Sequence, residues 1–100
     1  MPGPSNQWTD WAIDLPRPPQ TRGMSSAAVT LVLITLASYA NRYGICHPSA
    51  REIARRVEMK SDRVALALKA LEKIGYIRWV AAEGNRVSAW MLLDPPEPHP

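Results

Sequence analysis

The sequence has little cysteine and no long apolar run. Cys46 is the only cysteine among 100 residues, which excludes an internal disulfide framework and a zinc site built from thiolates. The longest apolar stretch, residues 27–40, has 14 residues and contains two threonines and a serine, whereas a transmembrane helix needs roughly 20 apolar residues. Residues 1–4 lack the basic and apolar regions of a signal peptide. These absences predict a cytoplasmic globular protein that has no membrane partner.

The residue groupings that carry catalysis are also missing. The sequence has no Ser-His-Asp arrangement, no glycine-rich phosphate loop and no paired carboxylates. Cys46 and His47 invite interpretation as metal ligands or as a nucleophile with its base. However, adjacent residues on a strand point to opposite sides, no second ligand pair exists, and His99 lies in a proline-rich tail. We therefore expect a buried thiol, a partly exposed imidazole, no metal, no cofactor and no enzymatic activity.

Prolines are concentrated at the two ends of the chain. Five of the ten lie in residues 1–23 and four lie in residues 94–100. We therefore expect a proline-rich N-terminal lead over residues 1–23, extended except for a turn around residues 8–13, and an extended C-terminal tail over residues 94–100. Both segments are expected to stay outside the core, so the folded domain spans residues 24–93.

Charge is distributed unevenly. The acidic residues of residues 1–16 and of residues 94–100 give each end a charge of −2. Between them lie all 12 lysines and arginines against five acidic residues, a surplus of seven positive charges. Such a surplus attracts polyanions through its summed field. Many small basic domains bind nothing acidic, so charge alone leaves nucleic-acid binding and simple solvation as equal alternatives.

The first predicted helix has a serine cap at residues 25–26 and runs to about Arg42, where Gly44 ends it. Its main apolar stripe repeats every three or four residues. This stripe consists of Val29, Val32, Leu33, Leu36 and Ala40. Leu31 and Ile34 lie off the stripe, so the helix is apolar on more than one side and needs more than one neighbour to bury it.

Two further predicted helices have capping signals of their own. Residues 49–52 form a capping box, and the helix that they begin ends near Arg56. Ser61 caps the third helix, which runs to about Ile74 and is ended by Gly75 in a left-handed conformation. The expected inward-facing side chains are Ile53, Ala54 and Val57 from the second helix, and Val64, Ala67, Leu68, Leu71 and Ile74 from the third.

After Gly75 the period changes from helical to strand-like. Residues 76–80 and residues 86–93 are rich in strand-forming side chains and are separated by a turn at Gly84 and Asn85. This pattern predicts a β-hairpin, and residues 46–47 can add a short edge strand. The predicted order is helix, short strand, helix, turn, helix and hairpin, which is an α+β fold that is mainly helical.

The sequence resembles a known family through Pro48-Ser-x-x-x-Ile53-Ala-x-x-Val57-x-Met-x-Ser61-x-x-Val64-x-x-Ala67-Leu68-x-x-Leu71-x-x-x-Gly75-Tyr-Ile77. This pattern is similar to the winged helix-turn-helix domain of bacterial transcription regulators and of plasmid- and phage-borne helix-turn-helix proteins. The resemblance covers about residues 23–93. It implies three helices with a β-hairpin wing, and binding of double-stranded DNA, usually as a dimer. In that family the third helix enters the major groove and the wing contacts the backbone or the minor groove.

Basic residues at the corresponding positions are candidates for DNA contacts. Arg63 lies in the first turn of the third helix, where a guanidinium can pair with guanine. Lys60 and Ser61 lie at the positive end of that helix, which suits phosphate. Ala65 and Leu66 stand where the family usually has polar or basic residues, so base readout should be sparse and backbone attraction larger. The candidate DNA-binding residues are Ser49, Arg51, Arg55, Lys60, Ser61, Arg63, Leu66, Lys69, Arg78, Asn85 and Arg86.

Two tryptophans in the lead bear on assembly. Trp8 and Trp11 either dock in cis on the face that contains Leu31 and Ile34, or they form a homodimer interface with that face. All four residues are candidates for this interface. The sequence thus predicts a sequence-preferring DNA-binding homodimer that acts in transcription regulation or in plasmid or phage maintenance. The alternative is a winged-helix protein-interaction module that uses the apolar third helix and the N-terminal tryptophans.

Overall fold

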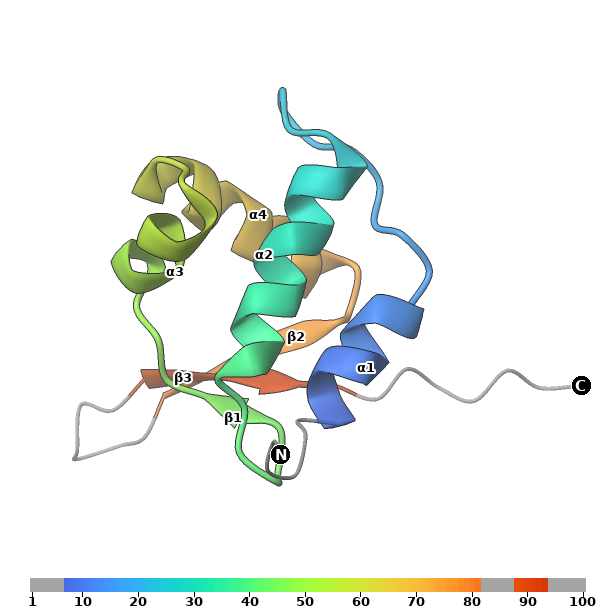
Figure 1. Cartoon of the computed structure of the whole chain (residues 1–100), viewed down its shortest axis with the longest axis vertical. Coiled ribbons are helices and arrows are strands. Elements are labelled where there is room, and N and C mark those ends of the chain that lie inside the picture. Colours follow the sequence, from blue (N-terminus) through green and yellow to red (C-terminus); the bar gives the residue numbers. More distant parts are fainter. Residues whose placement is uncertain (1–6, 82–87, 94–100) are drawn as a thin grey trace, which may run out of the picture.

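The structure, a computed structural model, describes residues 7–81 and 88–93. Within these residues, helices lie over one face of a three-stranded antiparallel sheet (Figure 1). The elements are α1 (Gln7–Asp14), α2 (Ser26–Ser38), β1 (Ile45–Cys46), α3 (Ala50–Val57), α4 (Ser61–Lys73), β2 (Ile77–Ala81) and β3 (Ser88–Leu92). The predicted fold class, a mainly helical winged helix-turn-helix, is confirmed. No helix in the described ranges is long and apolar enough to cross a membrane.

Helix α1 lies where the sequence predicted only a turn, around residues 8–13, within a lead that was otherwise expected to be extended. Its residues Trp8, Trp11 and Ala12, with Leu15 just after its end, recur at helical spacing, and the amide of Leu15 donates to the carbonyl of Trp11 at 3.1 Å. Ala12 is fully buried and Leu15 is nearly so, because α1 packs against α2. The expectation that the lead stays outside the core is therefore wrong for these two residues. The prolines around α1 limit its length but leave room for two turns of helix.

Helix α2 starts as predicted but ends earlier. The Ser25 hydroxyl accepts the amide of Ala28 at 3.1 Å, which satisfies one free donor of the first turn. The helix ends at Ser38 because the side chain of Asn41 accepts the amides of Tyr43 and Ile45, which form a turn in place of further helix. The fully buried side chains of α2 are Val29, Val32, Leu33, Leu36 and Ala37, so Ala37 replaces the predicted Ala40.

The turn between α3 and α4 is formed by local capping. The Ser49 hydroxyl accepts the amide of Glu52, and the Glu52 carboxylate accepts the amide of Ser49 in return, as the capping box predicts. Glu58 then ends α3 in the left-handed conformation, with a φ of 59°. Helix α4 begins at Ser61, and its N-cap is Lys60, which makes no side-chain cap bond. The prediction that Ser61 is the cap is therefore wrong by one residue.

Gly75 ends α4 as predicted. Its φ is 89°, and the amide of Tyr76 donates to the carbonyl of Leu71 at 3.0 Å across the helix end. The predicted inner stripe of α4 is confirmed for Val64, Ala67, Leu68 and Leu71, which are all buried. Ile74 departs from the prediction because it is the C-cap of the helix and is 37% exposed.

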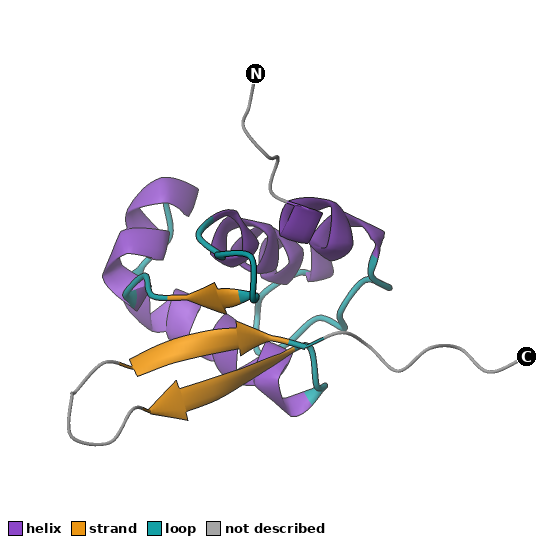
Figure 2. Ribbon diagram, turned by 90° about the horizontal axis from the view of Figure 1, so that it is seen from below, coloured by secondary structure: helices purple, strands orange, loops and turns teal. Residues whose placement is uncertain are grey.

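The sheet has the order β1-β3-β2, which confirms the predicted hairpin pairing (Figure 2). Ile77 pairs with Leu92, and both side chains are buried against the helices. The edge strand β1 lies one residue earlier than predicted, because the amide of Leu92 donates to the carbonyl of Gly44 at 2.8 Å and sets the register there. The predicted turn at residues 84–85 lies outside the described residues.

The inner stripe of α4 provides a test of the core. Leu71→Ala should lower the free energy of unfolding by roughly 2–5 kcal/mol, because it removes a fully buried side chain and leaves a cavity. Ile74→Ala is the matched control in the same helix, and it should cost less than about 1 kcal/mol because Ile74 is partly exposed. Urea denaturation measures both variants. Equal losses would contradict this assignment of the inner stripe.

Candidate nucleic-acid interface

The outward face of α4 is determined by its buried stripe. Because Val64 and Leu71 point into the core, residues on the opposite side of the helix face away from it. This opposite side contains Asp62, Leu66, Lys69 and Lys73, with Arg63 on one flank. All of these side chains are exposed except Leu66, which is half-buried and contacts the core.

A tight turn of the lead lies beside this face. Thr21 and Met24 pair through two backbone hydrogen bonds, and the residues between them, Arg22 and Gly23, both have positive φ. The turn and α4 together form a groove. This groove is lined by Thr21, Arg22, Leu66, Lys69, Ala70 and Lys73. Leu66 therefore shares a groove with the chain's own lead, which sequence reasoning did not foresee.

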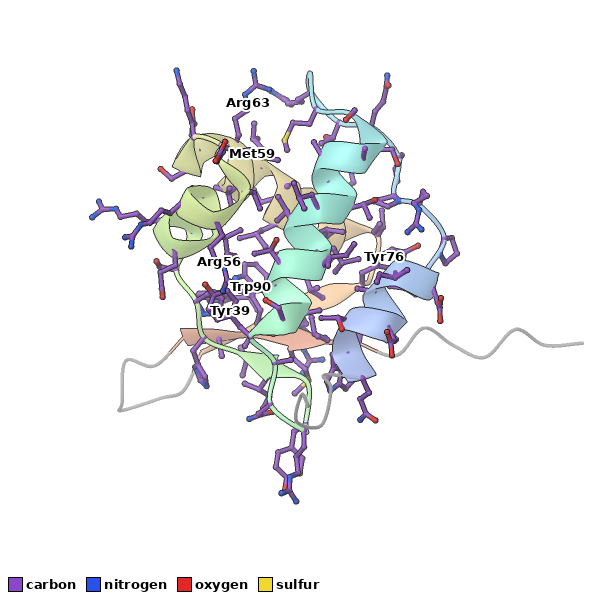
Figure 3. The ribbon with its side chains drawn as sticks, viewed as in Figure 1. Tyr39, Arg56, Met59, Arg63, Tyr76 and Trp90 are labelled. Atoms are coloured by element: carbon purple, nitrogen blue, oxygen red, sulfur yellow. The ribbon has the colours of Figure 1, made fainter. Side chains whose placement is uncertain are left out.

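Arg63 lies on the flank of α4 that is next to this turn. A Cβ built on Gly23 would lie 3.4 Å from Nη1 of Arg63, so the guanidinium lies close to the backbone of the turn. Arg63 also shares a second groove with Met59 and Lys60, formed where the turn meets the first residues of α4. Figure 3 shows Arg63 and Met59 together at the end of the molecule where α2 begins.

Helix α3 adds further basic residues. Arg51 and Arg55 are exposed and share the solvent face of α3, whereas the hydroxyl of the candidate residue Ser49 is already engaged in the capping box. Arg56 donates a hydrogen bond from Nη1 to the hydroxyl of Tyr39 at 3.3 Å. Its guanidinium also lies over the Tyr39 ring, with Cζ 5.4 Å from the ring centroid (Figure 3). The hydrogen bond that Arg56 donates to the Tyr39 hydroxyl raises the pKa of Arg56, which therefore keeps its charge.

The candidate residues of the wing are only partly described. Arg78 is exposed on β2, whereas Asn85 and Arg86 lie outside the described residues. Next to Arg78, the ring of Trp79 is 45% exposed and meets Trp90 edge to face, with the ring centroids 4.7 Å apart. The amide of Trp79 donates to the carboxylate of Glu72 at 3.5 Å, which connects the wing to α4.

The four residues predicted for a homodimer interface divide into two pairs. The rings of Trp8 and Trp11 meet edge to face, with their centroids 5.2 Å apart, and both side chains pack against the chain's own core. Trp8 lies so close to Gly44 that a Cβ there would be 2.7 Å from its Cζ2 atom. Both tryptophans therefore dock in cis. Ile34 is partly buried, but Leu31 stays 44% exposed, in a groove lined by Arg17, Ser26, Ala27, Thr30, Leu31 and Ile34.

Cys46 and its neighbour His47 differ in burial, as expected for adjacent residues of an extended segment. Cys46 is fully buried, and this burial raises the pKa of its thiol from 9.0 to about 12, whereas His47 is exposed. A thiol with such a pKa stays protonated near neutral pH and is therefore a poor nucleophile and metal ligand. Residues 7–81 and 88–93 contain no group of three or more His, Cys, Asp or Glu side chains that could hold a metal ion.

Comparison with known proteins agrees with this geometry. The model of a family described as "Helix-turn-helix domain" matches residues 26–77, which is just over half of the chain. No curated protein and no solved structure gives a significant match. The matched segment begins with α2 and ends at the first residue of β2, so α1 and the turn of residues 21–24 lie before it.

The burial of Cys46 predicts a specific pH dependence. Below pH 9.0 the thiol is neutral in both the folded and the unfolded chain, whereas between pH 9.0 and about 12 only the unfolded chain loses the proton. The free energy of unfolding should therefore fall as the pH rises through this window, by at most about 1.4 kcal/mol per pH unit from this group. The free energy of unfolding of Cys46→Ala, measured by urea denaturation at a series of pH values, should fall less steeply with pH than that of the wild type. Parallel curves for the two proteins would contradict the prediction.

Proposed function

The chain belongs to the helix-turn-helix domain family, and from this premise we propose that it is a sequence-preferring double-stranded DNA-binding protein. In this proposal α4 enters the major groove and the wing contacts the DNA backbone. The protein acts in the cytoplasm, in transcription regulation or in plasmid or phage maintenance.

The observation that carries this proposal is the charge on the exposed side of α4. Lys69 and Lys73 lie there with the acidic Asp62, Arg63 lies on one flank, and Lys60 is the N-cap residue just before the helix. The other exposed acidic residue of α4, Glu72, accepts the amide of Trp79. Within the described part of the chain, none of these four cations has an ion pair or a side-chain hydrogen bond to neutralise it. Unpaired cations on the exposed face of a helix match the phosphate backbone on either side of a major groove.

The basic residues have different roles in this proposal. Arg63 lies in the first turn of α4 and reads a base, because the first residues of a recognition helix reach furthest into the groove. Arg51 and Lys69 lie on α3 and further along α4, where they contact phosphates. Arg86 has the same role on the wing.

The alternative, a protein-interaction module, receives less support. It was based on the apolar third helix and on the tryptophans of the lead. Leu66 is half-buried beside Arg22, and Trp8 and Trp11 pack on the chain's own core. These apolar side chains are therefore already partly buried against the chain's own core, which weakens the argument for a protein partner.

The proposed protein is a homodimer, and its interface is centred on α2. Leu31 is the large apolar side chain that α2 leaves exposed, and Ile34 lies beside it in the same groove. Trp8 and Trp11 pack in cis and contribute at most their exposed edges to this interface. A twofold dimer places two α4 helices at half-sites roughly 34 Å apart, which doubles the few base contacts of one protomer.

DNA binding is tested by fluorescence anisotropy with duplexes at several salt concentrations. The wild type should bind a random duplex at low salt and lose affinity steeply as salt rises, because binding releases counter-ions. On a duplex selected from random sequences, Arg63→Ala should cost roughly 1–3 kcal/mol of binding free energy and relax the preference at one base position per half-site.

Arg42→Ala serves as the matched control, because Arg42 is exposed near the C-terminal end of α2, away from α4. It should leave binding to the selected duplex nearly unchanged. The function is refuted if the wild type shows no binding at low salt. The role of Arg63 is refuted if its variant weakens selected and random duplexes equally.

The dimer is tested by sedimentation velocity. Leu31→Glu should convert the dimer to a monomer without unfolding it, because Leu31 is 44% exposed in the protomer and the added charge would be buried in the interface. Tyr43→Glu is the control: it adds the same charge at a side chain that is 70% exposed and lies outside the proposed interface. A wild type that stays monomeric at high micromolar concentration, with and without duplex, would refute this assembly.

A further inference from the structure

We propose that the turn of residues 21–24 is an additional DNA-binding element, in which Arg22 binds a backbone phosphate next to α4. This inference rests on the proposed function and extends it to a residue outside the matched helix-turn-helix segment. Arg22 was not among the DNA-binding residues expected from the sequence, because its distance from α4 along the chain gives no sign of its position in space.

The turn holds Arg22 in a defined position. The amide of Thr21 donates to the carbonyl of Met24 at 3.0 Å, and the amide of Met24 donates to the carbonyl of Thr21 at 2.6 Å. The φ angles of Arg22 and Gly23 are 32° and 80°, which is the pattern of a type I′ turn. Asparagine before glycine suits such a turn best, and arginine suits it poorly. The conformation of the turn therefore does not account for the arginine at this position.

The turn is attached firmly to the domain. Met24 is 5% exposed and belongs to the core, and the hydroxyl of Ser26 donates to the carbonyl of Pro18 at 2.5 Å. These contacts fix the chain on both sides of the turn. The backbone of the turn thus needs little further ordering to bind a ligand, which lowers the entropic cost of a contact made by Arg22.

The position of the turn adds its charge to that of α4. Arg22 lines one groove with Lys69 and Lys73, and Gly23 lines the neighbouring groove with Lys60 and Arg63. The Arg22 side chain is exposed, so burial in the core does not account for an arginine at this position either.

Five cations therefore surround the outward face of α4, and none has an ion pair or side-chain hydrogen bond within residues 7–81 and 88–93. They are Arg22, Lys60, Arg63, Lys69 and Lys73. Like charges that gather without partners repel one another, and an anion of matching extent removes this repulsion. The cations line two grooves formed where the turn of residues 21–24 meets α4 and the residues just before it. A duplex backbone, with its regularly spaced phosphates, fits this arrangement better than a single small anion.

Three variants separate the charge of Arg22 from the shape of the turn. Arg22→Asn removes the charge while it suits the type I′ turn, so the domain should be as stable as the wild type or more so. Arg22→Lys keeps the charge. Arg17→Ala removes one positive charge from the same lead, but at the groove near Leu31, on a different side of α2. Each protein is titrated with a labelled random duplex of about 30 base pairs, close to three helical turns.

We expect Arg22→Asn to bind random and selected duplexes more weakly, by the same factor for both. The ratio of wild-type to variant affinity should shrink about 3.5-fold between about 50 and about 200 mM salt, because one counter-ion fewer is released. Arg22→Lys should keep the wild-type salt slope, and Arg17→Ala should keep both the slope and the affinity.

The inference is overturned if Arg22→Asn binds like the wild type at every salt concentration. It is also overturned if Arg17→Ala weakens binding equally, since the effect would then reflect net charge alone. In both cases the proposed function stands, provided that Arg63→Ala weakens binding to the selected duplex. A wild type that does not bind duplex at all overturns the proposed function and this inference together.

Discussion

The arrangement of the domain depends on the burial of α2. Its side chains are apolar around most of the helix, so a single neighbour cannot remove them from water. Helices α1, α3 and α4 all pack against α2, and Leu33 and Leu36 are completely buried among them. Burial of such a side chain contributes roughly 1.5–3 kcal/mol, so the contacts of α2 dominate the packing. Every other helix is positioned relative to this one.

This central packing determines which surface is free for function. Helix α4 buries Val64 and Leu71 against α2 and the sheet, and its opposite side must face outward. Glu58 and Gly75 give the chain its left-handed residues before and after α4, so both ends of the helix are fixed by the backbone. The cationic face of α4 is thus presented by a rigid element, and its side chains need not be ordered by a flexible loop before they bind.

The sequence predicted those features that depend on neighbouring residues. The capping box at Ser49, the left-handed Gly75 and the inner stripe of α4 from Val64 to Leu71 follow local rules, and all three are confirmed. Helix α1 was missed because two turns of helix between prolines have little local stability, and it is the packing of Ala12 on α2 that stabilises them. The early end of α2 was missed because the Asn41 side chain competes with the helix for backbone amides.

The candidate site shows the same limit of local reasoning. The exposed positions of Arg63 and Lys69 followed from the helical period, whereas the groove that Leu66 shares with Thr21 and Arg22 required knowledge of where the lead passes. Leu66 stands where the family that the sequence resembles usually has a polar or basic side chain, and the turn of residues 21–24 brings Arg22 to the same groove. In the proposed DNA complex, position 66 has no polar side chain to read a base, and Arg22 adds a side chain that binds the backbone, so affinity depends more on salt and less on sequence.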